Sequence, residues 1–186
     1  MQTDRTEFNP CIIALAGHSF SGKTTLGGEL SRVTNLRYFD VDAARLQLFP
    51  KKPLFKDFRN TMSMTAAYAW NHYLASEHLI TGEPIAVGAT YSHSSYTSML
   101  RDLSRLSKAP LTIFALNISE EALEERVKRR MEEGSLSVVT SLEHVLDLRR
   151  RFVPLEGDDV VQIDTSLPLE QNVAQILAAL EDLRRV

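Results

Sequence analysis

Short apolar segments alternate with longer segments of helical spacing along the chain. Residues 11–16 form a continuously apolar run, which is typical of a central parallel strand covered on both faces. Apolar residues of the stretch 60–81 recur at helical spacing, and Gly82 can end that helix. The full pattern predicts strands over residues 11–16, 37–40, 85–88, 111–117 and 160–163, and helices over residues 22–33, 60–81, 95–107, 120–131, 141–152 and 169–183.

Two hydroxyl residues mark the starts of predicted helices. Ser119 precedes Glu120 and Glu121, which combines a capping side chain with acids that the helix dipole favours, and Ser141 caps the next helix. Strands that alternate with crossover helices imply a parallel sheet with helices on both faces. The sequence therefore predicts a three-layer α/β fold, with residues 50–59 as a loop or lid.

Length and composition restrict the classes of protein. The 186 residues suit a single domain, residues 1–186, because no repeat or Gly/Ser linker divides them. The net charge of −3 gives no reason to expect nucleic acid as a partner. Cys11 is the only cysteine, which excludes an internal disulfide and a cysteine-based zinc site. With no apolar run of membrane length and no signal-like N-terminus, we expect a cytoplasmic protein. The expected oligomeric state is a monomer or a homodimer.

Residues 17–24, GHSFSGKT, carry the clearest chemical signal. They match the phosphate-binding pattern G-x-x-x-x-G-K-[ST] between a predicted strand and a predicted helix. Gly17 and Gly22 allow the backbone to turn its N–H groups inward, Lys23 can reach the β- and γ-phosphates, and the Thr24 hydroxyl suits Mg²⁺. His18 is expected to shape the loop. The predicted nucleotide-binding residues here are Gly17, His18, Ser19, Phe20, Ser21, Gly22, Lys23, Thr24 and Thr25.

A phosphate-binding loop alone does not separate motors, switches and kinases. Conventional ATPases and GTPases hold Mg²⁺ with an acid at the end of a neighbouring strand, but the third and fourth strands end here in Gly88 and Asn117. No Asn-Lys-x-Asp segment is present to read guanine. The acids lie instead at the end of the second strand, at Asp40 and Asp42, and Arg45 follows them.

With these residues the chain resembles the small P-loop kinases of the shikimate, gluconate and adenylylsulfate kinase group. It looks closest to the zeta-toxin and chloramphenicol-phosphotransferase-like, AAA-domain-like branch. The segments GHSFSGKTTL, FDVDAAR, AVGATYSH, LEERVKRR and RRRFVPLEGDDVVQIDTS follow the order of that family over nearly the whole chain. The resemblance implies a five-stranded sheet of order 2-3-1-4-5, and a kinase that uses ATP and Mg²⁺ to phosphorylate a hydroxyl of a small molecule.

The same resemblance implies roles for the two acids. Asp42 would orient or deprotonate the acceptor hydroxyl, and Asp40 would bind Mg²⁺ together with Thr24. A carboxylate beside the nucleophile and a cation at the phosphates, with Lys23, are sufficient parts for phosphoryl transfer. The alternative for Asp42 is a structural one, as the N-cap of a helix over residues 43–48.

Arginines form a basic cluster late in the chain. Arg126 and Arg130 share a helix face at the start of a lid over residues 131–141, and by resemblance they neutralise charge on the transferred phosphoryl group. Their alternative is a solvated face paired with glutamates, which is the favoured interpretation for Arg129. Arg151 is the favoured nucleotide contact among residues 149–151, from the family's Arg-Phe-x-Pro pattern. By the same resemblance, the strand over residues 160–164 and the following residues 165–166 would place backbone near adenine.

The acceptor side departs from the family pattern. Relatives often carry Asp-Ala-Thr after the third strand and then an arginine, whereas this chain has Gly88 and no arginine before Arg101. Residues 43–81 are expected to form the acceptor-side segment. Since ligands bind at the carboxyl ends of strands, the expected acceptor-side contacts are Asp42, Arg45, Thr90, Tyr91 and His93.

Three other functions stay open from the sequence, and plain ATP hydrolysis is the third of them because no residue clearly positions water. A polynucleotide 5′-hydroxyl kinase would share the P-loop and the acids, but the chain has no obvious basic strip outside the lid. A nucleotide-binding regulatory module without transfer activity would explain the missing acid at Gly88.

Overall fold

The computed structural model describes residues 5–49, 58–133 and 141–184. Its centre is a parallel five-stranded sheet of order β2-β3-β1-β4-β5, so the expected fold class and strand order are confirmed. The strands are β1 (Ile12–Ala16), β2 (Arg37–Asp40), β3 (Ile85–Ala89), β4 (Leu111–Asn117) and β5 (Val160–Asp164).

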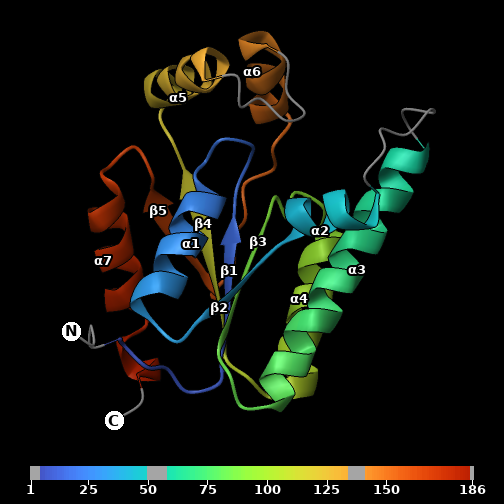
Figure 1. Cartoon of the computed structure of the whole chain (residues 1–186), viewed down its shortest axis with the longest axis vertical. Helices are drawn as coiled ribbons and strands as arrows, with labels where there is room; N and C mark the ends of the chain where they lie inside the picture. Colours follow the sequence, from blue (N-terminus) through green and yellow to red (C-terminus); the bar gives the residue numbers. More distant parts are fainter. Residues whose placement is uncertain (1–4, 50–57, 134–140, 185–186) are drawn as a thin grey trace.

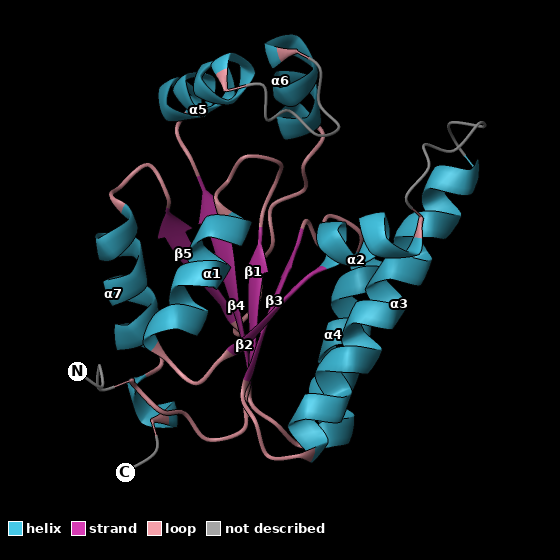
Figure 2. Ribbon diagram, viewed as in Figure 1, coloured by secondary structure: helices cyan, strands magenta, loops and turns pink. Residues whose placement is uncertain are grey.

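Helices cover both faces of this sheet. Figure 1 shows α1 and α7 on one face, α2, α3 and α4 on the other, and α5 with α6 above the end of the sheet to which the strands point. The same three layers are visible in Figure 2. The helices are α1 (Lys23–Val33), α2 (Val41–Leu48), α3 (Phe58–Ile80), α4 (Ser94–Ser107), α5 (Glu120–Glu132), α6 (Leu142–Arg150), α7 (Leu169–Ala179) and the 3₁₀ helix η1 (Glu181–Leu183).

Successive side chains of a strand point to opposite faces of the sheet, so the protein has two hydrophobic cores, one on each face. In β1, Ile12 and Ala14 pack toward α3 and α4, whereas Ile13 and Leu15 pack toward α1 and α7. All five residues of β1 are fully buried because the strand lies at the centre of a sheet covered on both faces. A third, smaller cluster joins α5 to α6 around Val127 and Val145.

The strand boundaries agree with the sequence-based expectation within one residue. Ser119 and Ser141 cap α5 and α6 as expected, since their hydroxyls accept hydrogen bonds from the backbone N–H groups of Ala122 and His144. The last helix differs, because α7 ends at Ala179 and a 3₁₀ turn follows. Of the loop or lid expected over residues 50–59, residues 58 and 59 belong to α3, and of the lid expected over residues 131–141, residues 131 and 132 belong to α5. Residues 50–57 and 134–140 lie outside the described residues.

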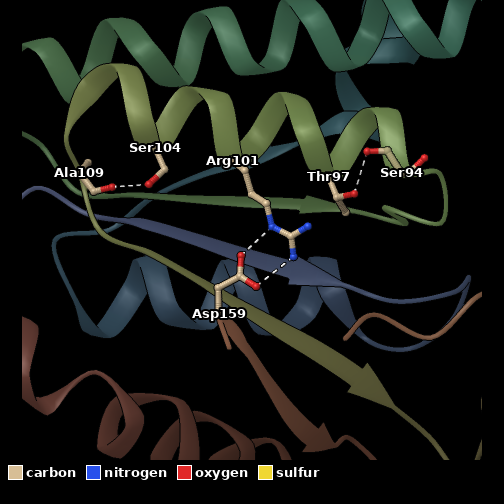
Figure 3. Close-up of polar contacts among 6 residues, drawn as sticks. All are labelled: Ser94, Thr97, Arg101, Ser104, Ala109 and Asp159. Atoms are coloured by element: carbon tan, nitrogen blue, oxygen red, sulfur yellow. Dashed lines mark hydrogen bonds and ion pairs between the residues drawn. The ribbon is translucent and has the colours of Figure 1, made fainter. Parts of the chain in front are cut away.

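Arg101, the first arginine after β3, joins two elements of the scaffold. Figure 3 shows its guanidinium pointing from α4 to the carboxylate of Asp159, just before β5. Its Nε and Nη2 donate to the two carboxylate oxygens at 2.8 and 2.9 Å. The Arg101 guanidinium lowers the pKa of Asp159, which stays ionised and holds α4 to the β5 side of the sheet. Among the described residues, no helix has the length and apolar character needed to cross a membrane.

Candidate functional site

The phosphate-binding loop connects β1 to α1 at the carboxyl end of the sheet (Figure 1). Gly22 has φ 96°, in the left-handed region, and forms the N-cap of α1 without a capping side chain. The first N–H groups of α1 are therefore open to an anion. A Cβ atom on Gly17 would lie 2.7 Å from the Ser21 hydroxyl and 2.8 Å from the Leu116 carbonyl oxygen. Both glycines are thus required by the shape of the loop.

Lys23 folds back over this loop. Its Nζ donates to the carbonyl oxygens of Gly17 and His18, both at 2.8 Å. Burial lowers the pKa of Lys23 to about 8, although Asp42 and Asp40 act in the opposite direction. The ammonium therefore lies at the phosphate cradle, close enough to both acids to feel their charge.

The remaining loop residues form a compact turn. Nδ1 of His18 lies 2.7 Å from the carbonyl oxygen of Ser19, and burial lowers the pKa of this histidine. Phe20 has φ 66°, and Ser21 is buried with its N–H donating to the His18 carbonyl oxygen at 3.3 Å. Thr25 is exposed on the first turn of α1. His18 thus contacts the backbone of the loop, and its role in shaping the loop stays a prediction.

Asp40 connects the loop to the end of β2. Its Oδ2 accepts from the Thr24 hydroxyl at 2.8 Å, and its Oδ1 accepts from the backbone N–H groups of Asp42 and Ala43 at 2.9 and 3.1 Å. Asp40 is therefore the N-cap of α2, and the alternative assignment of that cap to Asp42 is wrong. The reason is that Asp40 has the extended backbone an N-cap needs, whereas Asp42 already lies within the helix.

Thr24 and Asp40 fit a magnesium ion. The Thr24 hydroxyl gives its only proton to Asp40, which leaves its oxygen lone pairs available to a cation. A hydroxyl and a carboxylate are ligands that Mg²⁺ prefers, with phosphate oxygens and waters completing its shell. Within the described ranges, no group of three or more His, Cys, Asp or Glu side chains forms a separate metal site.

Asp42 lies in the first turn of α2 and is open to solvent. Nearby protein groups still displace part of the water around the Asp42 carboxylate, and this raises its pKa. The charges of Lys23 and Arg45 act to lower the same pKa. The structure thus brings Lys23 and Thr24 at the start of α1 together with Asp40 and Asp42 at the junction of β2 and α2.

Two arginines of α5 approach the loop from above. Nη1 of Arg126 donates to the carbonyl oxygen of Phe20 at 3.2 Å, and its Nη2 donates to the carbonyl oxygen of Thr165 after β5. The guanidinium of Arg130 lies over the Phe20 ring, 5.2 Å from its centre. Burial lowers the pKa of Arg126, and Arg129 and Arg130 add to this effect. The two predicted lid arginines therefore contact the phosphate-binding loop.

A pocket of about 320 Å³ opens beside the loop, between α1, α5 and the start of α7. Its volume lies at the lower end of the range for small-molecule sites. Thr165 contributes to it, so the backbone just after β5 borders this pocket, and its place near a base stays a prediction. The lining residues are Phe20, Gly22, Thr25, Leu26, Arg126, Arg129, Arg130, Thr165, Leu167, Pro168, Leu169 and Asn172.

Arg149 and Arg151, near the end of α6, lie in different environments. Arg151 is exposed and its Nη2 pairs with Asp147 at 2.5 Å, on the outside of α6. Arg149 is half-buried instead, and its Nη1 is buried without a hydrogen-bond partner in the described part of the chain. Its charge helps to lower the pKa of His18, so it lies near the loop. Helical spacing from the buried Val145 would have pointed to Arg149.

The residues after β3 that were expected to contact the acceptor differ in their exposure. Tyr91 is buried, with φ 52°, and its hydroxyl lies 2.9 Å from Nε2 of His72, so its side chain belongs to the core. Thr90 is half-buried, and His93 is exposed at the N-cap of α4. Thr90 and His93 are therefore accessible, whereas Tyr91 is not.

Two tyrosines near this region were not expected from the sequence. The rings of Tyr68 and Tyr96 stack with their centres 3.8 Å apart and their planes at 4°. The Tyr68 hydroxyl accepts from the backbone N–H of Tyr91 at 3.1 Å, and the Asp42 charge reaches it. Only the helical position of Tyr68 was available as a signal, and it is shared by ordinary core residues.

Comparison with known proteins places the chain among kinase folds. The sequence model of a family described as AAA domain matches residues 12–155. No curated protein matches. Among solved structures, a presumptive kinase from Chloroflexus aurantiacus is 20% identical, with a TM-score of 0.74 over 95% of this chain and 98% of its own.

Two further solved structures are similar over most of their length. A gluconokinase from Sinorhizobium meliloti is 23% identical, with a TM-score of 0.65 over 94% of this chain and 93% of its own. The adenylylsulfate (APS) kinase of Mycobacterium tuberculosis, solved with AMPPNP and APS, is 12% identical, with a TM-score of 0.66 over 93% and 98%. At these identities the likeness shows the fold.

Proposed function

Because this chain belongs to the AAA domain family and has the fold of P-loop kinases, we propose that it transfers the γ-phosphate of ATP to a hydroxyl group of a small molecule, with Mg²⁺. The substrate classes of the similar kinases differ from one another, since one is named for gluconate and another for adenylylsulfate. The acceptor is therefore proposed only as a hydroxyl compound.

One observation carries the proposal. Lys23 in the phosphate cradle and Asp42 on α2 lie close enough that each shifts the pKa of the other. Asp40 fixes this arrangement because one of its oxygens binds Thr24 of the loop and the other caps the helix that carries Asp42. A phosphate cradle and a solvent-accessible carboxylate are thus held at a fixed separation, which positioning catalysis requires.

Binding of ATP follows from the surrounding groups. Its phosphates would lie on the N–H groups of the loop and at the N-terminus of α1, and its base would occupy the pocket of about 320 Å³. The lid arginines Arg126 and Arg130 would face the phosphate chain, since both already contact the loop. Arg149, rather than the exposed Arg151, has a buried N–H group available for a phosphate oxygen.

Transfer would proceed by displacement at the γ-phosphorus. The acceptor oxygen forms a bond to phosphorus, the bond from phosphorus to the β–γ bridging oxygen breaks, and ADP leaves. Asp42 would orient the acceptor hydroxyl and take its proton, and Lys23 would neutralise the charge on the transferred group. Magnesium held at Thr24 and Asp40 would supply further charge neutralisation at the phosphates. Arg45, Thr90 and His93 would contact the acceptor.

The proposal is tested by measuring ADP formation from ATP and Mg²⁺ with a panel of hydroxyl compounds, including sugars, polyols, sugar acids and oligonucleotides. We expect one class of small molecule to stimulate ADP release with matching formation of a phosphomonoester. The Asp42→Asn variant should lose about two to four orders of magnitude in kcat with little change in ATP affinity.

Asp102→Asn is the matched control, because Asp102 forms an exposed ion pair with Arg105 on α4. This variant should retain the activity of the unchanged protein. Unchanged transfer by Asp42→Asn would remove Asp42 from the mechanism. Transfer to an oligonucleotide 5′-hydroxyl alone would establish the polynucleotide kinase instead, and tight ATP binding without transfer to any acceptor would establish the regulatory module.

A further inference from the structure

Gly88 occupies the position at which the resemblance leads one to expect an acid. It pairs with Asp40 of β2 on one side and with Leu15 of β1 on the other, at the carboxyl end of β3. A side chain here would lie in the sheet beside the proposed magnesium site. The absence of an acid at this position thus needs a structural explanation.

The space over Gly88 is filled from the neighbouring strand. A Cβ atom on Gly88 would lie 2.0 Å from the hydroxyl oxygen of Tyr38, and a Cβ atom on Gly27 of α1 would lie 2.2 Å from the ring of the same tyrosine. No real Cβ atom tolerates such distances. Tyr38 is therefore inserted between α1 and β3, and the two glycines are what make room for it.

The Tyr38 hydroxyl reaches the acid that the site retains. It donates to Oδ2 of Asp40 at 3.2 Å, and this is the same oxygen that accepts the Thr24 hydroxyl proton at 2.8 Å. An ionised carboxylate only accepts hydrogen bonds, so the Tyr38 hydroxyl is the donor of this pair. Two hydroxyl donors thus fix one carboxylate oxygen.

Packing alone does not account for the hydroxyl group. The ring of Tyr38 joins the core on the α1 face of the sheet, and a phenylalanine would fill the same space. Only the hydroxyl group meets Asp40. A hydrogen bond to a charged group contributes more than one between neutral groups, and it also restricts the rotamer of the acid.

We propose that Tyr38 is a positioning residue of the magnesium–nucleotide site, whose hydroxyl holds Asp40 in place from the space that an acidic side chain at position 88 would otherwise occupy. This inference rests on the proposed function, because it assigns to Thr24 and Asp40 the role of holding magnesium. It explains why Gly88 does not signify a lost site.

The test measures binding and needs no acceptor. Binding of a non-hydrolysable ATP analogue is followed by calorimetry at increasing Mg²⁺ for the unchanged protein and for Tyr38→Phe. We expect the variant to need about three- to tenfold more Mg²⁺ for half-maximal tightening of binding, with its magnesium-free affinity unchanged. Tyr73→Phe is the matched control, since Tyr73 is exposed on α3 and stacks on Trp70.

Three further variants test whether an acid at position 88 can take over the role of the Tyr38 hydroxyl. Tyr38→Val should show a weaker magnesium response than Tyr38→Phe shows, and adding Gly88→Asp to Tyr38→Val should restore it, because the removed ring leaves room for the acid. Gly88→Asp alone should lower the thermal stability, since its side chain meets the ring. Such rescue is not expected of a residue that only packs.

Two results would overturn the inference. One is a magnesium response of Tyr38→Phe within twofold of that of the unchanged protein. The other is an equal loss of analogue affinity with and without Mg²⁺, which would show that Tyr38 acts only on the shape of the loop. If the unchanged protein binds the magnesium–analogue complex but transfers phosphate to no acceptor, the proposed function fails while this test of Tyr38 still decides its own question.

Discussion

Lys23 gives nucleotide binding a pH dependence whose sign and size follow from the structure. In the protein without nucleotide, burial holds the pKa of Lys23 at about 8. Nucleotide phosphates favour the ammonium form, so binding should raise this pKa and take up a proton. Affinity is therefore complete below pH 8 and is lost as the pH rises above that value.

The size of the change in affinity follows from the fraction of Lys23 that is protonated at each pH. With a pKa of about 8, roughly nine-tenths of Lys23 is protonated at pH 7 and roughly one-tenth at pH 9. The dissociation constant of an ATP analogue should thus rise about tenfold between these pH values, or about 1.4 kcal/mol. The terminal phosphate is already ionised over this range, since its second pKa is about 6.

Calorimetry checks both the affinity and the proton uptake. Titrations at pH 8 in two buffers of different ionisation enthalpy should show uptake of about half a proton per nucleotide. Lys23→Arg should remove this pH dependence, because a guanidinium does not titrate in the range. Lys128→Met, on the exposed face of α5, should keep it. A constant dissociation constant from pH 7 to pH 9 would show that Lys23 does not take up a proton when the nucleotide binds.

Three other pairs of variants test separate parts of the structure. Gly27→Ala should lower the melting temperature by several degrees because its Cβ atom would lie 2.2 Å from a tyrosine ring, whereas Gly28→Ala meets nothing within 4 Å and should stabilise α1 by up to ~1 kcal/mol. Asp40→Ala should cost about 0.5–2 kcal/mol in urea unfolding through loss of the α2 cap. Asp40→Asn should keep the cap oxygen but lose the oxygen that faces Thr24 and Tyr38, so it should lose the magnesium response with a smaller loss of stability. Arg149→Ala should weaken binding of the ATP analogue about tenfold without loss of stability, since its buried Nη1 has no partner in the described part of the protein, and the exposed Arg150→Ala should change neither. Equal effects within any of these pairs would contradict the contacts on which they depend.

Most of the fold could be predicted from the sequence because its signals are local. The apolar run of β1 and the hydroxyl caps of α5 and α6 each depend on a few adjacent residues, and all three have the expected structure. The loop residues from Gly17 to Thr24 form one short motif, and they run from the end of a strand into the start of a helix as expected.

The parts that could not be predicted depend on contacts between distant segments. Tyr38 lies in an ordinary strand pattern, and nothing local shows that it occupies the space over Gly88. The choice between Arg149 and Arg151 depends on which face of α6 meets the loop. The cap of α2 moved from Asp42 to Asp40 because the helix begins directly after β2, a boundary that propensity does not fix to one residue.

Phosphorus NMR of ATP turnover is the most direct test of phosphate transfer from ATP to a small-molecule hydroxyl. With the unchanged protein, Mg²⁺ and the acceptor panel, we expect the γ-phosphate signal of ATP to be replaced by a phosphomonoester signal of one small-molecule acceptor, in equal amount to ADP. Formation of inorganic phosphate and ADP without any phosphomonoester, or no consumption of ATP with any acceptor, would contradict it.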